Sequence, residues 1–196
     1  AALNTTGAFK VVSTADKTIT VTGNIVGVDA TSNETITIQS GTNAGVDDGT
    51  IAIAGTIGTQ IESVSLKAGT AIQLGGNITT KNVSDNDVTI TGPAVLTANV
   101  DIDVSANTSG THEGDITFSS TINDTDGSSP YKLTLDTNAG AISVNGIIGG
   151  TNKVGIIDIN KTDGAGSITL AGIGNSSANA GSGATGNEGI VDIGNT

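Results

Sequence analysis

The chain lacks several residue types on which common protein functions depend. It has 196 residues and contains no Cys, Met or Trp, and its seven basic residues are all Lys. Without Cys, disulfide bonds, thiolate metal sites and cysteine nucleophiles are excluded. Without Arg and with a net charge of −12, the chain is a poor candidate for nucleic-acid binding. No apolar run approaches the roughly 18 residues that a membrane span requires.

Aromatic residues are scarce, yet the aliphatic residues follow a regular pattern. Only Phe9, Phe118 and Tyr131 are aromatic, and few aromatics with a high net charge are typical of disorder. Against this, Ile and Val alternate with Thr or Ala in residues 19–22 and 51–53, which is the period of a β-strand. The β-branched residues favour strands, and the 29 Gly residues disfavour long helices. We therefore predict an ordered, all-β chain.

One motif recurs along the chain: two aliphatic residues separated by a spacer, usually followed by Gly and often by Ile. The copies begin at Ile19, Ile51, Ile72, Val88, Ile116, Ile142 and Ile168. The last three starts are 26 residues apart, and a second strand-like run lies between most copies. A unit of this size cannot bury its own apolar face, so neighbouring units must stack.

Stacked equivalent strands predict a right-handed parallel β-helix, or β-solenoid, of roughly seven irregular coils. We expect residues 1–196 to form a single solenoid segment, with a Gly/Ser/Asn-rich loop at residues 175–189. The alternative is a pair of β-sandwich domains of roughly 100 residues each. Such sandwiches do not explain the 26-residue repeat, and the chain has no Trp to fill their core.

The repeats resemble those of large bacterial exoproteins of the filamentous-haemagglutinin type. The resemblance rests on residues 133–150 and on the similar sequence segments at residues 114–122 and 49–57. It extends over about residues 17–174. It implies a secreted or cell-surface rod with adhesive or community roles. No functional residue can be transferred from the family, and its secretion-guiding cap is not recognisable at residues 1–10.

Candidate chemical groups are few. His112 lies beside Glu113, but no nucleophile is recognisable nearby, so we predict that the protein is not an enzyme. Asp124 and Asp126 begin a sequence similar to a Ca²⁺-binding loop, which lacks the third acidic ligand and the closing Glu. They are the candidate metal ligands, and Ca²⁺ is the one cofactor considered. The alternative is that the acidic residues only solubilise the surface and form turns.

The sequence therefore predicts a structural or adhesive segment of an extracellular or cell-surface fibrous protein. The expected partners are neighbouring copies or flanking solenoid coils, stacked end to end, and surface glycans. The chain stops directly after a strand at residues 193–196, which suggests a longer chain or end-to-end assembly. The main alternative is a self-assembling extracellular filament subunit. Two further alternatives are a polysaccharide-acting enzyme and an ice-binding solenoid, the latter because of Thr rows such as Thr35 and Thr37.

Overall fold

The computed structural model describes eleven stretches of the chain, and all of its regular structure is β-strand. The described residues are 2–14, 16–28, 34–41, 49–58, 60–81, 86–105, 114–125, 129–137, 139–161, 167–174 and 191–195. Within them there is no helix, and all strand pairings are parallel. The prediction of an all-β chain with parallel stacking is confirmed.

The strands form three ladders that run along the molecule. Ladder 1 consists of β2 (Phe9–Ser13), β5 (Glu34–Ser40), β8 (Ile61–Ala68), β11 (Val88–Thr91), β14 (Ile116–Phe118), β17 (Ile142–Ile148) and β19 (Ile168–Ile173). Ladder 2 consists of β3 (Thr18–Val21), β6 (Thr50–Ile53), β9 (Ala71–Leu74), β12 (Ala94–Leu96) and β15 (Ile122–Asp124), and it joins ladder 1 through the end of β17. Ladder 3 consists of β1 (Leu3–Thr5), β4 (Ile25–Gly27), β7 (Ile57–Gly58), β10 (Ile78–Thr79), β13 (Val100–Asp103), β16 (Leu133–Thr137), β18 (Ile157–Lys161) and β20 (Val191–Asn195).

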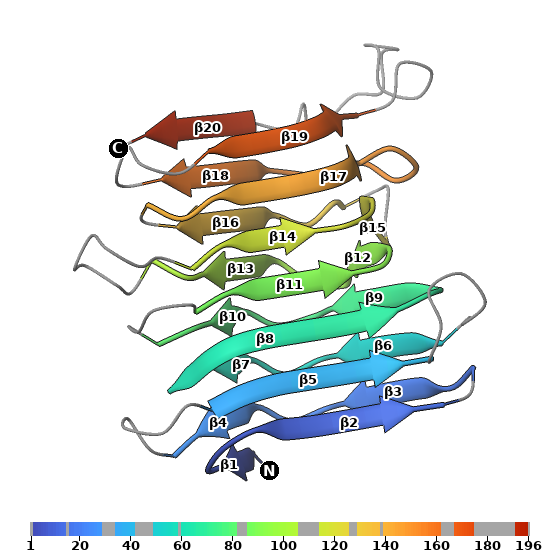
Figure 1. Ribbon diagram of the computed structural model, residues 1–196. Helices are drawn as coiled ribbons and strands as arrows, with labels where there is room; N and C mark the ends of the chain where they lie inside the picture. Colours follow the sequence, from blue (N-terminus) through green and yellow to red (C-terminus); the bar gives the residue numbers. More distant parts are fainter. Residues whose placement is uncertain are drawn as a thin grey trace.

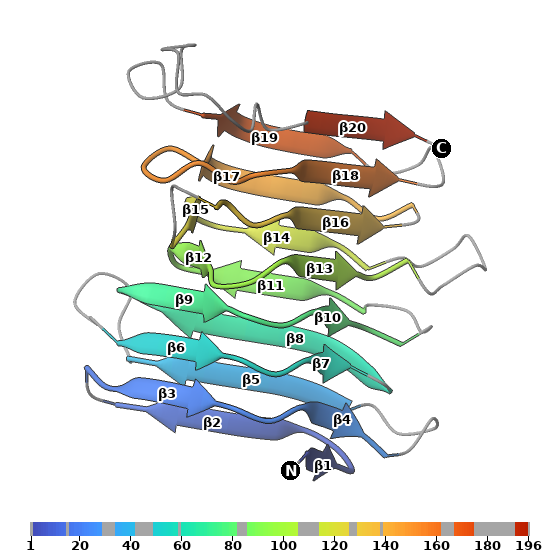
Figure 2. The same ribbon diagram turned by 180° about the vertical axis from the view of Figure 1, so that it is seen from behind.

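The chain visits the three ladders in turn, and we call each such circuit a coil. β5, β6 and β7 form one coil, and β8, β9 and β10 stack directly on them. Figure 1 shows ladder 1 on the near face, with β1 at one end of the stack and β20 at the other. Figure 2 shows ladders 2 and 3 side by side on the opposite face. This arrangement is consistent with a parallel β-helix.

The structure corrects the alignment of the sequence repeat. Ile19, Ile51 and Ile72 lie in register on ladder 2, whereas Ile116, Ile142 and Ile168 lie in register on ladder 1. The copies of the sequence motif therefore belong to two different faces of the solenoid. A coil contains up to three strands, whereas the sequence suggested two. The 26-residue spacing of the last three copies is a true coil-to-coil repeat.

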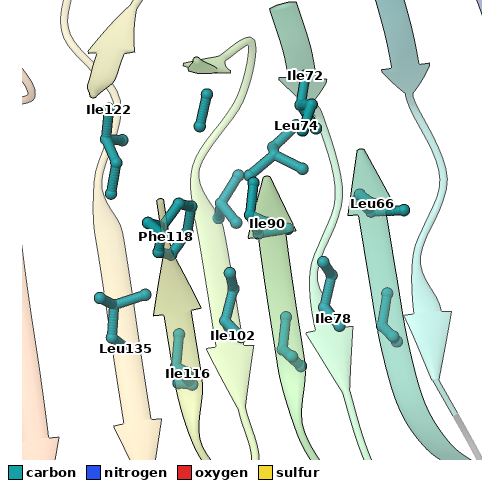
Figure 3. Packing of buried hydrophobic residues seen from close by; sticks show 14 of the residues in the cluster. Leu66, Ile72, Leu74, Ile78, Ile90, Ile102, Ile116, Phe118, Ile122 and Leu135 are labelled. Atoms are coloured by element: carbon teal, nitrogen blue, oxygen red, sulfur yellow. The ribbon is translucent and has the colours of Figure 1, made fainter. Parts of the chain in front are cut away.

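The core is a set of aliphatic columns that run along the stack. The longest column lies on ladder 3 and contains one inward residue from each of its eight strands: Leu3, Ile25, Ile57, Ile78, Ile102, Leu135, Ile159 and Ile193. The largest fully buried side chain is Phe118, which lies near Ile90, Ile102 and Leu135 in Figure 3. Fully burying one such aliphatic side chain contributes about 2 kcal/mol, so neighbouring coils stabilise one another.

Glycines allow the backbones of successive coils to approach closely at the corner between ladders 2 and 3. A Cβ atom added to Gly55 would clash with the carbonyl oxygen of Gly23, and one added to Gly76 would clash with that of Gly55. These are the glycines of the recurring motif. Their role is to let one coil contact the next without a side chain between them.

Candidate functional surfaces

Asp124, the first predicted Ca²⁺ ligand, lies in the core of the solenoid. It is 1 % exposed and continues an inward column of ladder 2 in which the preceding residues are Leu74 and Leu96. Its Oδ2 atom accepts a hydrogen bond from the backbone N–H of Tyr131, and its own carbonyl oxygen accepts one from Asn152 Nδ2 at 2.8 Å. Asp124 therefore links the end of β15 to Tyr131, just before β16.

The structure does not describe the other residues that the sequence analysis considered as chemical groups. Asp126, His112 and Glu113 lie outside the described residues. Among the residues that are described, no group of three or more His, Cys, Asp or Glu side chains is placed to hold a metal ion. Ca²⁺ binding by Asp124 and Asp126 thus stays a prediction from the sequence, and the structure adds a structural role for Asp124.

Several Asp and Asn side chains connect one coil to the next. Asp87 Oδ1 accepts a hydrogen bond from the N–H of Asp115 at 2.8 Å, and Asp115 Oδ1 accepts one from the N–H of Ala141 at 2.6 Å. Four Asn side chains also accept a hydrogen bond from a backbone N–H of the next coil. Three of them directly precede a strand of ladder 3, and the fourth lies in ladder 2. The acceptor–donor pairs are Asn24–Thr56, Asn77–Asp101, Asn99–Lys132 and Asn123–Thr151. These bonds satisfy backbone groups that the ladders leave unpaired.

The outward face of ladder 3 is acidic. One column contains Asp101, Thr134, Asp158 and Asp192, and the adjacent column contains Asp103 and Asp136. Asp101 and Asp103 occupy the solvated side of β13, because both residues are partly exposed while Ile102 between them is buried. Lys132 Nζ forms an ion pair of 2.8 Å with Asp158 Oδ2.

This crowding of carboxylates changes their protonation equilibria. Burial, then the negative charges of Asp103, Asp101 and Asp158, raise the pKa of Asp136 to about 6. Burial and Asp103 also raise the pKa of Asp101, and the charge of Lys132 opposes this. Among the described residues, no hydrogen-bond donor reaches the buried Oδ1 atom of Asp136. The face is therefore an electrostatically strained surface that protonation relieves.

The outward face of ladder 1 has a different character. A single column on this face places a hydroxyl on six successive strands, and its members are Thr37, Ser65, Thr89, Thr117, Ser143 and Thr169. Lys10 of β2 is the remaining member of the column. The separate Thr rows in the sequence did not reveal this column, because its Ser and Thr residues are 24 to 28 positions apart.

Both ends of the stack expose positions that are buried elsewhere. In the long column of ladder 3, the exposed fraction is 40 % for Leu3 and 47 % for Ile193, whereas Ile102 is fully buried. At the same ends, Phe9 of β2 and Ile168 of β19 are only partly buried. Among the described residues, the first and last strands of ladders 1 and 3 pair with a neighbouring strand on one side only.

Comparisons with known proteins found no match, so the class of this protein is inferred from its fold and surfaces. No protein-family model matches the chain. No curated protein and no solved structure matches it either. Within the described residues, there is no helix of the length and apolar character needed to cross a membrane. The class that the fold defines is the parallel β-solenoid.

Proposed function

We propose that the chain is a non-catalytic structural and adhesive segment of an extracellular or cell-surface fibrous protein. One observation carries the proposal: the aliphatic column of ladder 3 continues through all eight of its described strands. In such a stack each coil is stabilised mainly by its two neighbours, so the molecule extends by repetition. A continuous packed core of this kind suits a stiff rod or spacer.

For the winding we propose a right-handed parallel β-helix of about seven coils, roughly 35 Å long at one strand spacing per coil. The seven strands of ladder 1 support the coil number. The course of the chain in Figure 1 supports the handedness, because ladder 1 runs to the right on the near side and ladder 3 runs to the left behind it as the chain climbs. Right-handed crossovers are also strongly preferred between parallel strands.

The non-catalytic assignment is supported by how the described carboxylates are used. Asp87 and Asp115 accept hydrogen bonds from backbone N–H groups of the next coil, and Asp124 accepts one within its own coil, so all three carboxylates have structural uses. An adhesive role is supported by the hydroxyl column of ladder 1, since hydroxyl groups both donate and accept hydrogen bonds. The partner class that fits this face is a surface glycan. The extracellular assignment rests on the repeat style and composition of the sequence.

Cellular location tests the main proposal. Antibodies against the chain should label intact producing cells or extracellular fibres, and external protease should remove that label. Labelling that appears only after permeabilisation would overturn the proposed location.

Glycan binding is tested separately with two matched variants. Thr117→Lys places a charged side chain in the hydroxyl column of ladder 1, and Thr134→Lys makes the same change on the outward face of ladder 3. Binding to surface glycans should be lost in the first variant and retained in the second. Equal binding by both variants would show that ladder 1 is not the adhesive face.

The second candidate function is a filament subunit that assembles end to end. The exposed apolar residues at both ends of the stack favour it. In this case the rod is extended by association between copies as well as by repetition within one chain.

A further inference from the structure

The hydroxyl column of ladder 1 presents hydrogen-bonding groups that the protein itself leaves largely free. Its members lie in register on six consecutive strands and are at least partly exposed: Thr37, Ser65, Thr89, Thr117, Ser143 and Thr169. Within the described residues, the hydroxyl of Ser143 has an acceptor, Asn145 Oδ1 at 3.4 Å, and the other members form no hydrogen bond through their side chains. By contrast, the buried hydroxyl of Thr137 donates to the carbonyl oxygen of Gly140 at 3.1 Å. The column therefore satisfies its hydrogen bonds through water or a partner.

Most of this face is also uncharged, although the chain has a net charge of −12. β11, β14, β17 and β19 contain no Asp, Glu or Lys, and the Lys residues of the outward columns, Lys10 and Lys67, lie on β2 and β8. The acidic residues of ladder 3 lie on the opposite face (Figures 1 and 2). Packed sheets are about 10 Å apart, which exceeds the Debye length of about 8 Å at physiological ionic strength. An uncharged polar partner therefore fits this face, because it meets neither repulsion nor an unpaired charge.

A single sugar unit is too small to bind such a column. One hydrogen bond contributes a net gain of about 0.5–1.5 kcal/mol, whereas association costs at least about 4 kcal/mol in lost translational and rotational freedom. One or two hydrogen bonds do not offset this cost. About six of them contribute on the order of 3–9 kcal/mol, which is comparable to the cost or exceeds it. The ligand must therefore contact several coils at once.

We propose that the hydroxyl column binds an uncharged, linear polysaccharide of β-linked hexose units that lies parallel to the stack of coils. This inference rests on the proposed adhesive role of ladder 1, and it names the class of glycan and its direction on the face. Successive strands place a hydroxyl about every 4.8 Å, which is close to the length of one hexose unit in an extended β-linked chain. The hydroxyls of each sugar unit donate and accept hydrogen bonds, as those of Ser and Thr do. Each coil thus contacts one sugar unit.

The dependence of binding on ligand length tests the direction of the glycan. Cello-oligosaccharides of two to six units, which are uncharged β-linked glucose chains, are titrated into the 196-residue chain, and binding is followed by NMR chemical shifts. The two-unit chain should show no detectable binding. The six-unit chain should bind roughly ten-fold more tightly than the three-unit chain, because it reaches more coils of the column.

Variants of nearly equal shape test the role of the hydroxyls. Thr117→Val removes one hydroxyl from the middle of the column and should weaken binding of the six-unit chain roughly five-fold. Thr117→Ser keeps the hydroxyl and should bind as the unmodified chain does. Thr134→Val makes the same change on the outward face of ladder 3 and should leave binding unchanged. Thermal denaturation checks that all three variants are folded.

Three results would overturn the inference: no binding of the six-unit chain, equal affinity for the two-unit and six-unit chains, or equal effects of Thr117→Val and Thr134→Val. None of these results by itself contradicts an adhesive role. That role is lost only if the comparison of Thr117→Lys with Thr134→Lys also shows no binding of surface glycans by ladder 1. The proposed cellular location has its own test and is unaffected by these outcomes.

Discussion

Asp87 and Asp115 occupy equivalent positions in successive coils, and the Oδ1 atom of Asp87 accepts a 2.8 Å hydrogen bond from the backbone N–H of Asp115. Asp115 repeats the interaction with Ala141 in the next coil. The acidic residue is thus part of the stacking repeat as well as of the surface charge. This explains how a chain with a net charge of −12 can use some of its carboxylates to hold itself together.

The contribution of this bond can be measured with two variants of equal charge. Asp87→Ala removes the acceptor for the Asp115 N–H and should lower the free energy of unfolding by about 1 kcal/mol. Asp87→Asn keeps an acceptor oxygen and should retain most of the stability. Urea denaturation of both variants gives the difference. If Asp87→Ala and Asp87→Asn were equally stable, the hydrogen bond would have no role in stacking.

A close backbone contact predicts an effect of one methyl group. Gly55→Ala places a Cβ atom against the carbonyl oxygen of Gly23 in the preceding coil, and we expect a loss of about 1–3 kcal/mol. Gly172→Ala is the matched control, because its Cβ would meet only Ile147 Cγ1 at 3.9 Å. Thermal denaturation should separate the two variants clearly. A neutral Gly55→Ala would show that the corner has room to adjust.

The inward and outward sides of β17 differ in their tolerance of charge. Ile142 is fully buried, and Ile142→Asp would place an unpaired carboxylate in the apolar column, at a cost of several kcal/mol. Ser143 is outward and partly exposed, so Ser143→Asp adds the same charge with an expected effect within about 0.5 kcal/mol. Circular dichroism and denaturation of both variants check this prediction. Similar losses of stability would mean that the strand faces are wrongly assigned.

The alternation in the sequence was sufficient to predict the inward face of individual strands. The alternation at residues 51–53 placed Ile51 and Ile53 on one side of a strand, and both are buried in the structure. The 26-residue repeat predicted parallel stacking. It did not distinguish ladder 1 from ladder 2. The physical reason is that every inward position in a narrow solenoid requires an aliphatic residue, and close corners require Gly, so Ile51 and Ile116 have the same local pattern on different faces.

The roles of the polar residues were harder to predict than the fold. Asp124 was selected as a Ca²⁺ candidate because its spacing to Asp126 is typical of a calcium loop. The structure places Asp124 in an inward column, where Leu96 precedes it. The Asn and Asp bonds between coils join residues 24 to 33 positions apart, and local sequence does not show whether such a residue forms a turn, binds a cation or reaches the next coil.

The acidic face of ladder 3 predicts an unusual dependence of stability on pH. The pKa of Asp136 is raised to about 6 in the folded chain, above the ordinary value of 3.8, so the folded state binds its proton more tightly than the unfolded state. The destabilising effect of the charged carboxylate is therefore fully present above about pH 6. It is progressively relieved as the pH falls towards 4. Because solvent screens this partly exposed group, we expect a gain on the order of 1 kcal/mol or less.

Asp136→Asn tests this contribution, because the amide is a neutral replacement for the protonated acid. The variant should be more stable than the unmodified chain at pH 7, and the difference should shrink at pH 4.5, where Asp136 is itself largely protonated. Asp16→Asn, an exposed carboxylate outside ladder 3, controls for the change in net charge. Chemical denaturation at the two pH values provides the measurement. A benefit of Asp136→Asn that is the same at both pH values, or that Asp16→Asn reproduces, would show that crowding around Asp136 does not govern the pH response.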